Sequence, residues 1–251
     1  MVFIETVTSR LAAFGAVGVV FLAGQGCSPS QPHTTSPSKP AEHDHHSQPV
    51  PVPPTLEGIS GRLRSMGDPA VALRLSRVTL VGALEFPEGG DRLRVEETAI
   101  WPNRYELRLR GAAERPPVVA LTGAALGLSL PPGWPRSFQP TEDFARLRLR
   151  SLFVLRHVAQ ALAGGGRIVA TSYPVEGVVA VQARDQYGTF RIIWGGPARG
   201  MLAIEDESGR MHFPAFFRAG PWFLPAMQSY ESNGRISTVL YVTSIETEPG
   251  R

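Results

Sequence analysis

Apolar and charged residues alternate most regularly over residues 92–96 and 104–110. In these two stretches every second residue is apolar and the residues between are charged; the apolar positions are Leu93, Val95, Tyr105, Leu107 and Leu109. A period of two with one polar face indicates an antiparallel sheet that meets solvent on one side. The pattern therefore predicts that these five side chains face the interior.

A helical period marks residues 142–163, for which the sequence predicts one long amphipathic helix. Thr141 precedes it as a capping residue, and three glycines from Gly164 onward end it. Its apolar stripe comprises Phe144, Leu147, Leu155, Val158 and Leu162. Arg146, Arg150, Arg156 and His157 are expected to lie largely away from that stripe, on a solvated face.

Short apolar runs bounded by Gly, Pro, Asn and Asp indicate the remaining strands. About nine are predicted, at residues 78–86, 92–96, 104–110, 178–184, 189–194, 200–205, 212–219, 223–231 and 236–246. A further hairpin is expected within 118–130, and short helices at 56–66 and 69–76. The fold class is therefore α+β: a curved antiparallel sheet that holds helices on one face, in a domain spanning residues 56–251.

The first 27 residues have the layout of a bacterial secretory signal. Arg10 precedes an apolar run at residues 11–24, which is shorter than the roughly 20 residues of a membrane-spanning helix. Cys27, the only cysteine, follows this run and is predicted to be lipidated and to anchor the mature chain to a membrane. The alternative is cleavage near Ala23, which leaves Cys27 as a free thiol. Glu5 is atypical of the region before the apolar run, and a translation start at Val7 would remove it.

Residues 28–55 form a Ser-, Pro- and His-rich segment that predicts a disordered tether. Within it, residues 42–46 carry His43, His45 and His46 with two carboxylates, a set that binds transition metals weakly. A polar linker run is the favoured interpretation, because a tether has no surrounding residues to orient the imidazoles.

Composition and motifs exclude several classes of function. One cysteine excludes a disulfide framework, and a net charge of +3 spread along the chain does not indicate a nucleic-acid partner. Of the six histidines, only His157 and His212 lie in the folded region, and neither lies in a hydrolase or metalloprotease motif. We therefore expect no enzyme activity, no cofactor and no metal.

Four stretches resemble the periplasmic lipoprotein carriers LolA and LolB and related LolA-like domains. They are residues 67–84, the turn Ile100-Trp-Pro-Asn-Arg-Tyr105, the helix start Pro140-Thr-Glu-Asp-Phe144, and residues 219–246 with their Asn233-Gly234 turn. The resemblance implies an unclosed, strongly curved antiparallel β-barrel with helices on its concave, apolar side. It also implies a location in the periplasm or cell envelope and a role in holding lipid, including lipoprotein handling.

The predicted function is a monomeric, membrane-tethered lipoprotein that binds an acyl chain or other apolar group between sheet and helix. The expected ligand contacts are Leu93, Val95, Tyr105, Leu107, Leu109, Phe144, Leu147 and Leu155. The alternative is a structural or protein-interaction lipoprotein with a packed, ligand-free interior, and an enzyme ranks third.

Three further groups of residues have two interpretations each. Arg146, Arg148 and Arg150 suit either acidic lipid headgroups or a solvated helix face, and the solvated face is favoured. Trp194, Trp222 and Phe223 suit either a pocket or the core, and the core is favoured. The acidic run at residues 205–207 is expected only to solvate a turn.

Overall fold

One antiparallel sheet contains all the strands that the computed structural model describes. The model describes residues 54–250, apart from 90–91, 111–116, 196–198 and 220–221. In chain order the strands are β1 (Leu75–Glu85), β2 (Leu93–Ile100), β3 (Arg104–Leu109), β4 (Val119–Thr122), β5 (Ala125–Leu128), β6 (Arg167–Val169), β7 (Val179–Asp185), β8 (Gly188–Trp194), β9 (Met201–Asp206), β10 (Gly209–Ala219), β11 (Trp222–Ser232) and β12 (Arg235–Pro249).

The strands follow the order β5-β4-β3-β2-β1-β12-β11-β10-β9-β8-β7-β6. Neighbours in the chain pair as hairpins on each side, and β12 returns to pair with β1 in the middle. The sheet does not close, since β5 and β6 are its two edges. The nine predicted strands and the hairpin within 118–130 are present, and β6 is an additional short strand.

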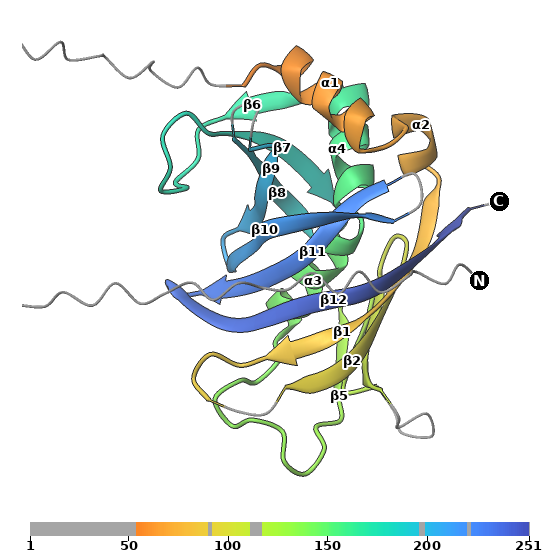
Figure 1. Ribbon diagram of the computed structural model, residues 1–251, viewed down its shortest axis with the longest axis vertical. Helices are drawn as coiled ribbons and strands as arrows, with labels where there is room; N and C mark the ends of the chain where they lie inside the picture. The colour runs from red at the N-terminus through yellow and green to blue at the C-terminus, as the bar shows by residue number, and fades with distance from the viewer. Residues whose placement is uncertain (1–53, 90–91, 111–116, 196–198, 220–221, 251) are drawn as a thin grey trace, which may run out of the picture. The chain divides into compact units, whose positions relative to one another are not determined.

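Four helices of the described part of the chain accompany this sheet: α1 (Leu56–Met66), α2 (Pro69–Ala72), α3 (Glu142–Leu152) and α4 (Val154–Ala163). The sheet curves around α3 and α4, and α1 and α2 lie across one end (Figure 1). The unclosed, curved sheet with helices on its concave side, which the resemblance to LolA-like domains implied, is therefore confirmed.

The prediction of one long helix over residues 142–163 is wrong. Thr141 does cap it, since its hydroxyl oxygen accepts from Phe144 N at 3.2 Å. The helix is interrupted at Phe153, whose backbone leaves helical geometry with φ −105° and ψ 20°. Phe153 is fully buried, and its ring centre lies 5.4 Å from that of Trp101. The break thus coincides with tertiary packing, and no Gly or Pro at this position indicates it in the sequence.

The predicted inward-facing residues do face the core. Val95, Tyr105, Leu107, Phe144, Leu147 and Leu155 are almost completely buried, and Leu93 and Leu109 are partly buried against them. Register explains this, because Val95 lies opposite Leu109 on β3, and Leu107 lies opposite Val119 on β4. The side chains of α3 thus pack on the concave face as the alternation predicts.

No helix among the described residues is long and apolar enough to span a membrane. Cys27, the histidine cluster at 42–46 and residues 28–53 of the predicted tether at 28–55 lie outside the described residues.

Candidate functional site

Two buried arginines, Arg148 and Arg150, lie between α3 and the sheet. Arg148 donates from Nε to Glu97 Oε2 at 3.1 Å and from Nη1 to Gln228 Oε1 at 2.7 Å. Glu97, on β2, is completely buried. Its position was foreseeable, since it continues the inward alternation of Leu93 and Val95.

Arg150 points to the other side of α3. It makes a bidentate pair with Asp185 at the end of β7, with distances of 2.8 and 3.0 Å, and it also pairs with Asp206 at the end of β9. Its guanidinium carbon lies 4.4 Å from the ring centre of Phe190. Such pairs hold two distant strands to one helix.

A solvated helix face was the wrong expectation for Arg148 and Arg150, as was a headgroup role. The reason is the curvature of the sheet, because α3 contacts β3 and β4 as well as β9 and β10. A helix enclosed on several sides has no fully solvated face, and its cations need partners inside the protein.

The acidic run at residues 205–207 also departs from the prediction. Glu205 and Asp206 end β9 and are engaged in ion pairs, Glu205 with Arg191 at 3.1 Å and with Arg210 at 2.7 Å. Within the described ranges, no three His, Cys, Asp or Glu side chains come together as a metal site.

The core next to these ion pairs contains the eight residues predicted to contact a ligand. Tyr105 lies beside Glu97 and Arg148, and burial, followed by the charge of Glu97, raises its pKa well above the usual value. Tyr105 therefore stays protonated and neutral. None of the eight residues lines the two grooves described next, and ligand contact by them stays a prediction.

The first groove, which we call the slot, lies between α1 and the ends of β9, β10 and β11. It has a volume of about 330 Å³ and is lined by Arg62, Ser65, Met66, Arg199, Gly200, Met201, Phe216 and Phe223. Met66 and Met201 are buried, whereas Phe223 is 38% exposed. Methionine and phenylalanine side chains suit flexible apolar ligands, because thioethers adapt to irregular shapes.

Close packing fixes α1 over this slot. A side chain on Gly67, just after α1, would place its Cβ 2.4 Å from the ring of Trp222, so only glycine allows the approach. Trp222 and Trp194 are buried in the core, which confirms the favoured interpretation for these two, while Phe223 lines the slot.

Arginines border the slot on two sides. Arg62 on α1 and Arg199 before β9 are exposed, and neither has an ion-pair partner among the residues described. The arrangement combines an apolar lining with two free guanidinium groups, a combination that suits an apolar chain bearing an anionic group. Sequence reasoning missed it, because its residues come from four separate segments with no shared period.

The second groove, which we call the seam groove, extends along α4 and β7, and His157 on α4 is one of the residues that line it. This histidine was expected on a solvated face, yet it is only 3% exposed. Burial lowers its pKa to about 3, so the imidazole is neutral at physiological pH. The other histidine of the folded region, His212, is held by Glu231 through Nε2 and lies 3.3 Å from the Tyr173 hydroxyl through Nδ1.

No family model matches this chain, and no curated protein matches its sequence. Among solved structures, it is similar to a LolA superfamily protein from Nitrosomonas europaea at 13% identity and a TM-score of 0.42, over 78% of this chain and 94% of that one. It is also similar to a DUF1329 family protein from Desulfovibrio piger at 8% identity and a TM-score of 0.41, again over 78% and 94%. Identities and TM-scores this low give no information about function. The function must therefore be inferred from the side chains of this protein.

Proposed function

We propose that this protein is a non-enzymatic, membrane-tethered binding module of the cell envelope that holds the apolar tail of an anionic amphiphile. The slot is the observation that carries the proposal. Its lining of two methionines and two phenylalanines accepts an acyl chain, and Arg62 and Arg199 at its border attract the anionic group.

The place of the slot in the chain supports the same role. It lies on α1, which begins directly after the proposed tether, residues 28–55. A flexible tether of this length spans about 30 Å on average. Acylation of Cys27 would therefore keep the slot within reach of lipids in the same membrane, and Cys27→Ser would release the protein into the soluble fraction.

The interior under α3 is the weaker candidate site. Its arginines are neutralised by their own acidic neighbours and its apolar side chains are buried. A ligand there needs movement of α3 and loss of the ion pairs, which the slot does not require.

This packed interior favours one alternative, a structural or protein-interaction lipoprotein without a ligand. The two functions differ in their response to a charge in the slot. Phe223→Glu places a carboxylate beside the apolar lining at an exposed position, so it lowers the affinity for a fluorescent fatty acid with little effect on folding.

The matched control is Ile236→Glu, since Ile236 is 44% exposed and does not line the slot. We expect wild type and Ile236→Glu to bind the fatty acid equally and Phe223→Glu to bind at least about tenfold more weakly, a difference of about 1.4 kcal/mol. Absence of binding to the wild type would favour the structural alternative.

A further inference from the structure

The seam groove lies where the two limbs of the unclosed sheet meet. The β7–β8 turn contacts the β2–β3 and β4–β5 turns through the Tyr187 hydroxyl, which donates to Asn103 O at 3.3 Å and to Gly123 O at 2.9 Å. Beside this contact is a groove of about 690 Å³ that extends along α4 and β7. This volume is within the usual range of small-molecule sites, about 300–1,000 Å³.

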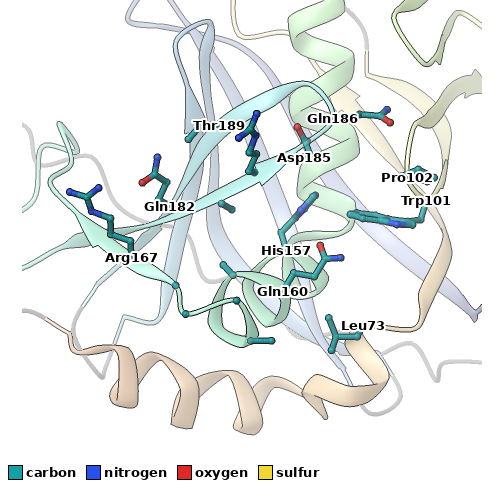
Figure 2. Close-up of a pocket in the computed structure, with 17 residues that line it drawn as sticks. Leu73, Trp101, Pro102, His157, Gln160, Arg167, Gln182, Asp185, Gln186 and Thr189 are labelled. Atoms are coloured by element: carbon teal, nitrogen blue, oxygen red, sulfur yellow. The ribbon is translucent and has the colours of Figure 1, made fainter.

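Aromatic surface and a buried imidazole form one side of the groove. Trp101 and His157 line it, with ring centres 5.1 Å apart, and Figure 2 shows Gln160 close to His157. Trp101 is only partly buried, and the Arg156 guanidinium covers part of it, with its carbon 4.1 Å from the ring centre. An indole partly open to a groove suits the flat C–H face of a ring-shaped ligand.

His157 has a hydrogen-bonding capacity that the described residues do not use. Its Nδ1 is buried and has no hydrogen-bond partner among them. A neutral imidazole offers one donor and one acceptor, and leaving such a group unpaired inside a protein is unfavourable. Nδ1 is itself shielded from the groove, so a ligand could bond to it only if the ring or its neighbours shifted.

Side-chain amides and a hydroxyl provide further polar groups along the groove. Gln160, Gln182 and Gln186 line it together with Thr189, and all four are exposed. Each amide both donates and accepts, which matches hydroxyl groups around a sugar ring. Asp185 also lines the groove, but Arg150 neutralises its carboxylate.

The net charge of the lining is positive. Arg167 and Arg184 line the groove and are exposed, and neither has an ion-pair partner within the described part of the chain. With His157 neutral and Asp185 paired, these two guanidinium groups set the sign of the local field.

We propose that the seam groove binds a saccharide, with a sugar ring against Trp101, hydroxyls bonded to the glutamine amides and Thr189, and an acidic substituent toward Arg167 and Arg184. The site is separate from the slot and does not depend on binding there. The protein would then contact an acidic envelope polysaccharide with one groove and an amphiphile with the other.

The test uses the disaccharides cellobiose and cellobiouronate, which differ by one carboxylate. Saturation-transfer NMR and calorimetry with up to about 10 mM sugar detect dissociation constants in the millimolar range. We expect both sugars to bind the full-length Cys27→Ser protein, with cellobiouronate bound at least about fivefold more tightly at low salt.

Variants assign the binding to the groove. Gln160→Ala and Trp101→Leu should weaken both sugars, whereas Arg184→Ala should abolish only the preference for cellobiouronate. The controls Gln139→Ala and Arg136→Ala change exposed residues that do not line the groove, so they should leave both affinities unchanged. Gln160 is exposed, so its variant keeps the test valid if Trp101→Leu fails to fold.

Two results would overturn this proposal. One is the absence of any signal from either sugar with the wild-type residues in place. The other is sugar binding that persists unchanged in Gln160→Ala and Trp101→Leu, since the sugar would then occupy another surface. Neither result bears on fatty-acid binding in the slot.

Discussion

Arginine side chains have opposite settings in the interior and at the slot. Arg148 and Arg150 are buried, and each is surrounded by carboxylates and other acceptors from distant strands. Arg62 and Arg199 are exposed beside an apolar groove, with no acidic partner among the described residues. The interior arginines therefore hold the fold together, whereas the slot arginines are available to a ligand.

The largest expected effect comes from breaking one interior pair. Glu97→Leu leaves Arg148 charged and unpaired in the core, so the free energy of unfolding should fall by about 3–5 kcal/mol. The double variant Glu97→Leu with Arg148→Met removes both charges and should recover most of that loss. Denaturant titration measures both, and a double variant as unstable as the single one would mean that the pair is not what stabilises this region.

The second prediction concerns acid. The pKa of His157 is about 3 in the folded protein and 6.5 in the unfolded chain, so only the unfolded chain takes up this proton between these values. Stability therefore falls as the pH drops from 6.5 toward 3, by about 1.4 kcal/mol for each pH unit. His157→Gln should lose less stability between pH 7 and pH 4 than the wild type, and His212→Gln serves as the control. Equal losses in the wild type and His157→Gln would contradict the buried, neutral imidazole.

A smaller effect is expected at the slot. Arg62→Gln with Arg199→Gln should weaken dodecanoate binding about 5- to 30-fold, equivalent to about 1–2 kcal/mol, without changing the unfolding free energy. Dodecanol, which has the same chain and no charge, should bind wild type and variant equally. An equal loss of affinity for both ligands would show that the arginines determine the shape of the slot and do not bind the carboxylate.

The smallest effect concerns a helix cap. Thr141→Ala removes the hydroxyl that accepts from Phe144 N, and should cost about 1 kcal/mol of stability because α3 is central to the interior. Fatty-acid binding in the slot should not change. Thermal unfolding of the variant beside that binding assay checks both statements.

Local sequence patterns predicted most of the fold. The alternation at Leu93, Val95 and Leu107 set the inward face of the sheet correctly, and Thr141 marked the start of α3. The break at Phe153 was not foreseeable, because it accompanies packing against Trp101 from a distant turn. A local pattern cannot report a contact made across the fold.

The candidate sites were harder to predict for the same reason. Glu97 could have been placed inside from its register alone, but the partners of Arg150 lie at the ends of β7 and β9. The slot joins α1 to β10 and β11, and the seam groove joins α4 to a turn between β2 and β3. Only the curvature of the sheet brings these segments together.

Methyl NMR with a spin-labelled fatty acid tests the central claim most directly. Met66 and Met201 line the slot, whereas Met211 lies in the interior with its sulfur 3.6 Å from Arg148 Nη1. Proton relaxation by the spin label falls steeply with distance, so the three methyl signals report which region the ligand enters. We predict broadening of Met66 and Met201 with Met211 nearly unchanged. Stronger broadening of Met211, or no broadening of any of the three, would contradict ligand binding in the slot.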